Sequence, residues 1–450
     1  MKSDERTIFA PATPIGESSV TVIRISGRNT FSMMQKIFSA KRESVVTVDF
    51  TKFESHTAHH GYIFSGSDIM DEVVVVVFKS PNSYTGEDVA EISSHGGRII
   101  YSKLNSLLIK NGGVHAEPGE FSKRAFLNGK LDLLQAEAIS DIISAKTELS
   151  YEAAKKQLTG FVSNKINKLR DSLINLCSLV ELDLDFVEEG LEVIDNKELI
   201  NRIAKIIQDI VYLANSYYSG RIIKDGISLT IIGKPNAGKS SLFNYLLKDS
   251  RAIVSDIPGT TRDYLEESLI LGGFVFNLID TAGIRKPSDH IEMKGIEFSV
   301  KKMDEADLIL DIIDLTGDRV VTTKPIEGKT IMVYNKADIA KDLPEGNLCV
   351  SALTGFNMSK LEEAIVSKAK EMVKDDSLSE VIITNERHKD LLLKSCEYLV
   401  NAKKLAINNS GNELISIEIR EAMNDLGEIL GKITNVNILN NIFSKFCIGK

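Results

Sequence analysis

The sequence is poor in cysteine, and the four that it contains are scattered. They are Cys177, Cys349, Cys396 and Cys447. No two form a C-x-x-C pair, which argues against a zinc site or a disulfide framework and favours a reducing compartment. No apolar run approaches the roughly 20 residues of a membrane-spanning helix, and the first residues lack the apolar core of a signal peptide. We therefore expect a cytoplasmic protein that makes no use of a membrane.

Proline is also scarce and unevenly placed. None occurs between Pro118 and Pro235 or after Pro344, and proline-free stretches of this length permit long helices. The net charge of −9 argues against a surface coated with nucleic acid, although it is compatible with a local basic groove. A composition of 43% hydrophobic and 26% charged residues is ordinary for a globular protein, and the length suits two to four domains.

Hydrophobic periodicity predicts a multidomain α+β protein with two kinds of flanking segment. Residues 1–118 mix both elements: strands are expected at 20–26 and 71–79, and helices at 31–38 and 101–113. Residues 119–218 and 376–450 instead repeat apolar residues at helical spacing throughout. These two segments predict several helices of one bundle.

Between the helical segments, residues 219–375 alternate apolar strands with helices. Strands are expected at 227–233, 273–280, 307–313, 330–335 and 347–351. This alternation is typical of a doubly wound α/β domain. The economical arrangement inserts the α/β domain into the helical domain, which is tolerated where the inserted termini lie close together.

The most informative motif opens this α/β domain. The β-branched run at 227–232 predicts a buried strand, and G-K-P-N-A-G-K-S follows directly at 233–240. Strand, glycine loop and helix form the setting of a phosphate-binding loop, in which backbone N–H groups and a helix N-terminus bind the phosphates. Lys239 adds a full charge, and the Ser240 hydroxyl can bind Mg²⁺. The residues assigned to this loop are Asn236, Ala237, Gly238, Lys239, Ser240 and Ser241.

Three further motifs, each after a predicted strand, indicate that the nucleotide is GTP. Asp280 begins D-T-A-G, where a carboxylate can hold Mg²⁺ through water. Asp338 ends N-K-A-D, and its carboxylate can accept from both N1–H and N2–H₂ of guanine. S-A-L at 351–353 can meet the guanine O6, and Thr261 in an intervening loop can complete the Mg²⁺ shell. The other residues assigned to GTP are Ser255, Asp256, Ile257, Pro258, Gly259, Thr260, Thr281, Ala282, Gly283, Asn335, Lys336, Ser351, Ala352 and Leu353.

The sequence lacks the residue that commonly orients the attacking water. Ras-like GTPases carry glutamine directly after D-x-x-G, but this chain has Ile284 there. Arg285, Asp289 and Glu292 are the nearby candidates for that role, and the residues alone do not choose among them. A monovalent cation could offset the developing phosphate charge, and Asn236 offers it a side-chain oxygen.

At this point the chain resembles the family of the tRNA-modifying GTPase MnmE, also called TrmE, over essentially its whole length. The resemblance rests on RISG (24–27), SYTGEDVAE…HGG (83–97), PGEFSKRAFLNGKLDLLQAEA (118–138), GKPNAGKSSL, DIPGTTRD (256–263), DTAGIR (280–285), NKAD and CIGK (447–450). It implies an inserted Ras-like P-loop GTPase domain. It also implies a role in adding an aminomethyl or carboxymethylaminomethyl group to C5 of the wobble uridine of tRNA.

The resemblance further implies cofactors, partners and site residues. The family forms homodimers through its N-terminal folate-binding domain, here residues 1–118. It works with an FAD-containing partner of the MnmG (GidA) type in a heterotetramer and uses a one-carbon tetrahydrofolate, either 5-formyl- or methylene-. The folate-contacting positions are Arg24, Glu91, Lys130 and Lys450, and Cys447 is implicated in the modification step.

In the GTPase domain, the resemblance favours Glu292 as the residue that orients water. Mg²⁺ falls on Ser240 and Thr261. The potassium site falls on Asn236, Ser255, Ile257 and Thr260. The implied division of the chain is an N-terminal domain (1–118), a helical domain (119–218 and 376–450) and the inserted GTPase domain (219–375).

Two other functions share parts of this pattern. A ribosome-assembly GTPase of the Era or Der type has the same GTP-binding motifs but predicts a basic RNA-binding module beside them, whereas the flanks here are acidic helices. A dynamin-like scaffold would use nucleotide only to assemble, but the chain offers no membrane-binding stretch.

Overall fold

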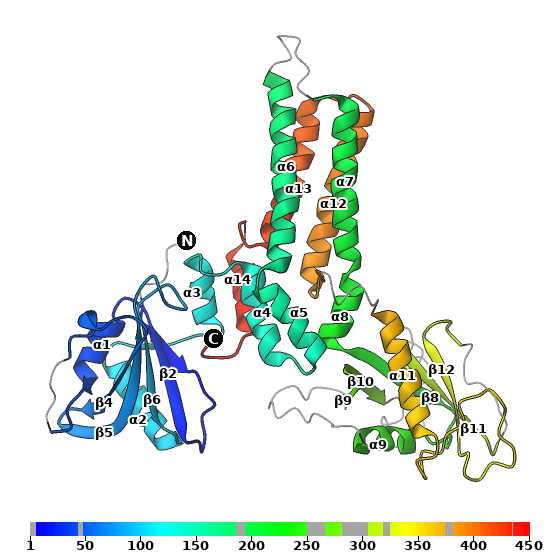
Figure 1. Ribbon diagram of the computed structural model, residues 1–450, viewed down its shortest axis with the longest axis horizontal. Helices are drawn as coiled ribbons and strands as arrows, with labels where there is room; N and C mark the ends of the chain where they lie inside the picture. The colour runs from blue at the N-terminus through cyan, green and yellow to red at the C-terminus, as the bar shows by residue number, and fades with distance from the viewer. Residues whose placement is uncertain are drawn as a thin grey trace, which may run out of the picture. The chain divides into compact units, whose positions relative to one another are not determined.

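The computed structural model describes residues 6–43, 48–185, 194–249, 266–280, 305–317, 325–373, 381–433 and 435–450 (Figure 1). These residues fall into two compact units. One unit comprises residues 1–140, 157–170 and 423–450, and the other comprises residues 141–156 and 171–422. The first unit therefore combines segments from both ends of the sequence.

The first unit contains a seven-stranded sheet with the strand order β3-β4-β5-β6-β2-β1-β7. Its strands are β1 (Ile8–Pro11), β2 (Val20–Ser26), β3 (Phe38–Ser39), β4 (Thr57–Ser65), β5 (Asp68–Phe78), β6 (Val89–His95) and β7 (Val114–His115). In β5, Val73, Val75 and Val77 are buried while the alternate side chains point outward. The buried face packs in one cluster with apolar residues of helices α1 (Thr30–Ile37) and α2 (Arg98–Lys110), so both helices cover the same face of the sheet.

The same unit also contains short helices from both ends of the chain. They are α3 (Glu120–Leu127), the first part of α4 (Leu133–Ser144) and α14 (Val436–Ser444). Leu133 and Ala136 of α4 pack against Leu439 and Phe443 of α14. Burial of these apolar side chains attaches the C-terminal helix to a segment about 300 residues earlier in the sequence.

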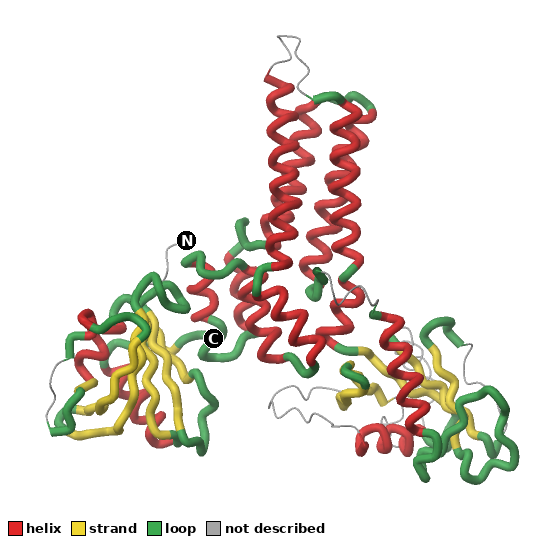
Figure 2. The backbone as a smooth tube through the Cα atoms, in the orientation of Figure 1, coloured by secondary structure: helices red, strands yellow, loops and turns green. Residues whose placement is uncertain are grey.

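Long helices dominate part of the second unit, where Figure 2 shows them as the red segments. They are most of α5 (Glu148–Leu158), the part of α6 (Phe161–Asp185) after residue 170, α7 (Asn196–Asn215), α8 (Tyr217–Asp225), α12 (Glu386–Ile407) and the part of α13 (Asn412–Ile429) before residue 423. In α7, Leu199, Ile203, Ile206 and Ile210 are buried at helical spacing and form the face that packs on its neighbours. Helix α7 of the first flanking segment packs on α12 of the second, as a bundle built from both segments requires.

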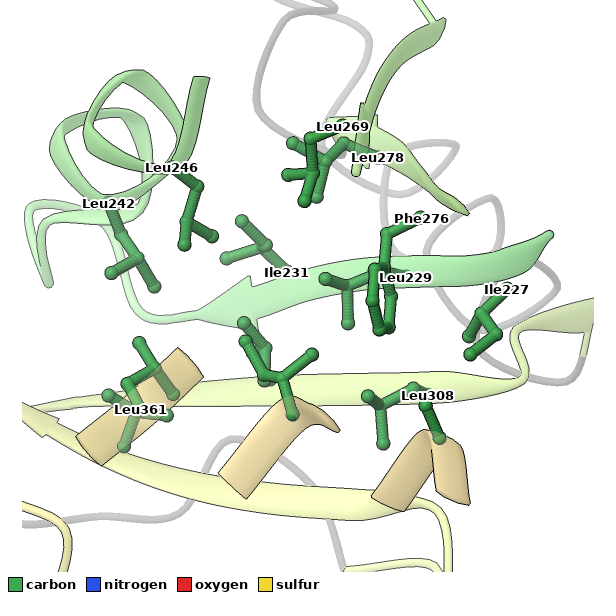
Figure 3. Packing of buried hydrophobic residues seen from close by; sticks show 14 of the residues in the cluster. Ile227, Leu229, Ile231, Leu242, Leu246, Leu269, Phe276, Leu278, Leu308 and Leu361 are labelled. Carbon is green, nitrogen blue, oxygen red and sulfur yellow. The ribbon is translucent and has the colours of Figure 1, made fainter. Parts of the chain in front are cut away.

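The second unit also holds a five-stranded sheet with the order β12-β11-β8-β10-β9. Its strands are β8 (Ile227–Gly233), β9 (Glu266–Leu271), β10 (Phe274–Asp280), β11 (Leu308–Asp314) and β12 (Thr330–Asn335). Only the pairing of β9 with β10 is antiparallel. Helices α9 (Lys239–Asp249) and α11 (Met358–Met372) share one cluster with the sheet, and in Figure 3 Leu242 and Leu246 of α9 converge on Ile231 of β8.

The two ends of the α/β domain meet at a tight contact in the same unit. A Cβ atom on Gly220 would lie 2.1 Å from the carbonyl oxygen of Ile383, and the backbone N–H of Ile383 donates to Ser216 Oγ at 3.0 Å. The start and the end of the domain thus lie side by side. This is the geometry that an inserted domain requires.

The prediction of a strand at 347–351 is wrong. Only one isolated parallel bridge forms there, between Tyr334 and Cys349. Two backbone hydrogen bonds link this segment to β12: the Tyr334 N–H donates to the Leu348 carbonyl oxygen, and the Val350 N–H donates to the Tyr334 carbonyl oxygen. The N–H of Ser351 donates instead to the Phe356 carbonyl oxygen, outside the sheet. The chain leaves the sheet edge after this bridge because it must form the loop that carries 351–353.

Candidate functional site

The backbone of the loop at 233–238 has positive φ angles and close contacts that favour glycine at two of its positions. Gly238 has a φ of +99°, and a Cβ atom on it would lie 2.1 Å from the Asn335 side-chain nitrogen. Gly233 also makes a close approach, since a Cβ atom on it would lie 2.5 Å from the carbonyl oxygen of Ile312. Asn236 also has a positive φ of 63° and is exposed. Both glycines are therefore needed for the close approach of this loop to neighbouring strands.

The ammonium and hydroxyl groups expected to bind the phosphates lie directly after this loop, at the start of α9. Lys239 begins α9, and its Nζ donates to the carbonyl oxygens of Gly233 at 2.8 Å and Lys234 at 2.9 Å. Ser240 and Ser241 are exposed on the first turn of the helix. The loop, the ammonium group and the helix N-terminus together fit a polyphosphate.

Asn335 connects the phosphate loop to the loop at 351–353. Its Nδ2 donates to the Ala237 carbonyl oxygen at 2.9 Å, and its Oδ1 accepts from the Ala352 backbone N–H at 3.1 Å. The Asn335 side chain is buried, so both hydrogen bonds are shielded from water. Three of the motifs predicted from the sequence are thus brought together by one amide side chain.

The neighbouring Lys336 is held by a carboxylate that the sequence did not single out. Its Nζ lies 2.6 Å from Asp314 Oδ2, at the end of β11. Burial raises the pKa of Asp314, but hydrogen bonds from Lys336 and Thr316 outweigh it, and the pKa stays below its ordinary value. Asp338 and Leu353 are exposed, so both remain accessible to a base.

Several residues assigned to GTP and its cations lie outside the described residues. They are Ser255, Asp256, Ile257, Pro258, Gly259, Thr260, Thr261, Thr281, Ala282, Gly283 and Glu292. Asp280 ends β10, and only its backbone is described. Among the described residues, no group of three His, Cys, Asp or Glu side chains could hold a metal ion.

A second group of predicted residues meets in the first unit. Arg24 of β2 and Glu91 of β6 are register partners, and Arg24 Nε donates to Glu91 Oε1 at 2.8 Å. Arg24 Nη1 also donates to the Gly449 carbonyl oxygen at 3.3 Å. The guanidinium lies 5.3 Å from the ring centre of Tyr84 and 5.7 Å from that of Phe121, in reach of a cation–π interaction with each.

The C-terminal segment and Lys130 each make a hydrogen bond near this group. Lys450 is half-buried, and its backbone N–H donates to the Cys447 carbonyl oxygen at 3.3 Å, while Cys447 itself is exposed. Lys130 Nζ donates to the Pro81 carbonyl oxygen at 3.0 Å, at the start of the loop that carries Tyr84. Arg24, Glu91 and the 447–450 segment are therefore adjacent, and Lys130 reaches the loop beside them.

A buried network of ion pairs supports this loop. The sequence contains its members within the motifs of the resemblance but does not predict that they pair. Arg124 is 2% exposed and donates to Glu87 at 3.1 Å and to Glu120 at 2.9 Å. Ser26 Oγ also donates to Glu87 at 2.7 Å. The charged residues of GEDVAE and PGEFSKR indicate that ion pairs could form. Spacing alone, however, does not predict a pair between segments about 37 residues apart.

The H-G-G motif contributes a second charged pair at the end of β6. His95 Nδ1 lies 2.7 Å from Asp71 Oδ1, and the His95 backbone N–H donates to Asp71 Oδ2 at 2.8 Å. The hydrogen bond with Asp71 and its negative charge raise the pKa of His95 above the ordinary value of 6.5.

We predict that His95 titrates above pH 6.5 and that Asp71→Asn lowers its pKa. Because the folded pKa is raised, the stabilisation by this pair is complete below pH 6.5 and is lost as the pH rises through the folded pKa. Histidine NMR titrations of the wild type and the variant measure both values. An unchanged His95 titration in the Asp71→Asn variant would contradict the assignment.

Comparison with known proteins identifies the chain. Residues 7–130 match the family model of the GTP-binding protein TrmE N-terminus, and residues 133–447 match that of the MnmE helical domain. A relative named tRNA modification GTPase MnmE, from Flavobacterium johnsoniae, is 41% identical over 99% of this chain and 100% of its own length. The chain belongs to the tRNA modification GTPase MnmE family. The namesake from Aquifex aeolicus is 42% identical over 98% of this chain and 99% of its own length.

Among solved structures, the G domain of the T. maritima FeoB iron transporter is 26% identical, with a TM-score of 0.23. It covers 32% of this chain and 98% of its own length. The parallel sheet with one antiparallel edge strand and a glycine loop after β8 gives this MnmE family member the Ras-like P-loop domain that the sequence predicts. In the part of the chain that the structure describes, no helix is both long and apolar enough to span a membrane.

Proposed function

We propose that this chain is a potassium-stimulated GTPase that acts with an FAD-containing partner of the MnmG type. In this proposal it adds an aminomethyl or carboxymethylaminomethyl group to C5 of the wobble uridine of tRNA, using a one-carbon tetrahydrofolate. Membership of the MnmE family supports the GTPase and tRNA parts. Membership of this family also favours tRNA modification over the Era or Der alternative, because the matched domains do not include an RNA-binding module of that type.

In the nucleotide site, Lys239 and the loop amides would hold the phosphates while Asp338 selects guanine. The exposed Ser240 hydroxyl would bind Mg²⁺ with Thr261, and the exposed Asn236 would contribute to a potassium site with Ser255, Ile257 and Thr260. The cations, when bound, supply positive charge against the phosphates. Glu292 would orient the attacking water in place of the glutamine that Ile284 replaces.

We expect GTP hydrolysis to be at least about tenfold faster in K⁺ than in Na⁺ at equal ionic strength, since one oriented charge is typically worth that much or more. The motivating observations are the exposed Asn236 in the loop and the missing glutamine. Asn236→Ala should remove the difference between the two salts. Equal rates in K⁺ and Na⁺ for the wild type would refute the potassium site.

In the modification site, one observation carries the proposal. Arg24 contacts both Glu91 and the backbone of the 447–450 segment, so it joins the implied folate-binding residues to the implied reactive cysteine. Glu91 supplies a carboxylate for the donor edge of a pterin, and Lys130 and Lys450 supply cations for a glutamate tail. The bound folate would supply the one-carbon unit, and these residues would orient it beside Cys447.

Glu91→Gln should weaken 5-formyltetrahydrofolate binding by about 10- to 100-fold, because a charge-assisted hydrogen bond is typically worth about 1.5–3 kcal/mol. Isothermal titration measures the affinity. Glu72→Gln is the matched control, because Glu72 is an exposed carboxylate on the same sheet that pairs with His60. Equal affinity in wild type and Glu91→Gln would contradict the folate site.

The remaining parts of the proposal concern assembly and compartment. We propose a homodimer formed by the N-terminal domains, a heterotetramer with the FAD-containing partner, and tRNA as the shared substrate in the cytoplasm. Sedimentation of the chain with and without the partner tests the assembly.

A further inference from the structure

Two glycines in the first unit approach other backbone segments more closely than any side chain would allow. Gly119 lies in the PGEF motif before α3, and Gly449 lies in the CIGK motif. The nucleotide site uses neither. The proposed modification site uses only the Gly449 carbonyl oxygen, which accepts from Arg24, and gives no role to the missing side chain of either glycine. Each contact joins the C-terminal segment to the part of the chain before residue 140.

Gly119 seats the end of α14. It is buried with a φ of +67°, and a Cβ atom on it would lie 2.6 Å from the Phe443 carbonyl oxygen and 3.0 Å from Phe446 Cβ. Phe443 and Phe446 are 2% and 7% exposed, and both belong to the buried cluster that joins α4 to α14. An added methyl group would have to displace backbone, which no rotamer change can avoid.

Gly449 seats the last residues on strand β1. It is buried with a φ of +94°, and a Cβ atom on it would lie 2.2 Å from the Pro11 carbonyl oxygen. Its own carbonyl oxygen accepts from Arg24 Nη1 at 3.3 Å. The position therefore requires glycine for the contact and, through the same residue, meets the guanidinium that pairs with Glu91.

We propose that Gly119 and Gly449 are positioning residues, and that PGEF and CIGK are the two halves of one device that docks residues 446–450. Docking fixes the backbone on both sides of Cys447 while its thiol stays exposed, two residues from the Arg24 contact. The docking follows from the contacts alone. Its consequence for the modification step rests on the proposed function of Cys447.

The chain supplies matched controls that separate the close contact from backbone strain. Gly112 also has a φ of +94° and Gly129 a φ of +69°, but both are exposed and neither would bring a Cβ atom within 4 Å of another atom. Alanine at Gly112 or Gly129 therefore introduces the strain of a positive φ without a collision. Alanine at Gly449 or Gly119 introduces both.

The experiment compares Gly449→Ala with Gly112→Ala, and Gly119→Ala with Gly129→Ala, in the full chain. Lys445 is exposed, so limited trypsin digestion followed by mass spectrometry can record release of Phe446–Lys450. We expect release to accelerate at least about tenfold in Gly449→Ala and Gly119→Ala but little in their controls, because cleavage reports the population of the undocked segment. The melting temperature and GTPase rate of Gly449→Ala should equal those of Gly112→Ala.

The product assay completes the test. With the partner and tRNA present, we expect Gly449→Ala to lose most of the modified wobble uridine and Gly112→Ala to retain it. Unchanged release in Gly449→Ala, or equal acceleration in its control, overturns the docking. Accelerated release with full product overturns the positioning role. If Cys447→Ser also gives full product, the proposed function of Cys447 fails, whereas the trypsin result for docking still stands.

Discussion

Asp338→Asn is expected to weaken GTP binding by about a hundredfold or more. The exposed carboxylate can accept from guanine N1–H and N2–H₂ together, and two charge-assisted hydrogen bonds are worth about 3–6 kcal/mol. Asparagine replaces one acceptor oxygen with a donor, which suits the C2 carbonyl of xanthine instead. Equilibrium titration with fluorescent GTP and xanthosine triphosphate measures both effects.

The control for this result removes a charge without touching the base. Glu345→Gln changes an exposed carboxylate a few residues further along the chain and should leave GTP affinity unchanged. Since the substitution leaves the loop at 233–240 unchanged, xanthosine triphosphate should bind the Asp338→Asn variant with the phosphate contacts intact. A variant that binds GTP as well as the wild type would remove Asp338 from the base site.

Cys447→Ser is expected to abolish formation of the modified wobble uridine while GTP hydrolysis continues at the wild-type rate. Serine keeps the size of the side chain, so docking through Gly449 should persist, but a hydroxyl is a far weaker nucleophile than a thiolate. Mass spectrometry of tRNA nucleosides from the reconstituted reaction measures the product, and phosphate release measures hydrolysis.

Cys177→Ser serves as the contrasting variant. Burial, with the hydrogen bond to Glu181 second, raises the pKa of Cys177 to about 11, so its thiol stays protonated and unreactive near neutral pH. We expect this variant to form normal product. Full product from Cys447→Ser would show that the reaction does not use the Cys447 thiol.

Local patterns predicted the elements whose residues are buried on both sides. Strands β8 and β11 lie within one residue of where the apolar runs at 227–233 and 307–313 placed them, because nearly uninterrupted burial leaves one interpretation. Strands β4, β6 and β9 were not predicted, because polar residues interrupt their apolar residues and resemble those of loops. At 347–351, apolar residues form a bridge only, as the chain turns away into a loop.

The contacts in the candidate sites likewise divide into those that the sequence predicted and those that it did not. Motif spacing placed Asn335 and Ala237 in one nucleotide site, because the ends of parallel strands meet at one edge of a sheet. The contact between Arg24 and Gly449 spans 425 residues, and only the resemblance, which assigned Arg24 and Lys450 to one site, suggested that Arg24 lies near the C-terminal segment. Lys336 with Asp314, and Arg124 with its two carboxylates, depend on strand order and helix packing that no local pattern specifies.

The most direct test of the central claim is mass spectrometry of wobble uridines in tRNA from cells that lack this chain. The claim is that one chain couples a guanine nucleotide site to a modification site. It predicts that the modified uridine disappears without the chain and returns with the wild type, but not with Asp338→Asn or Cys447→Ser. Modified uridine at normal levels in cells without the chain would contradict it.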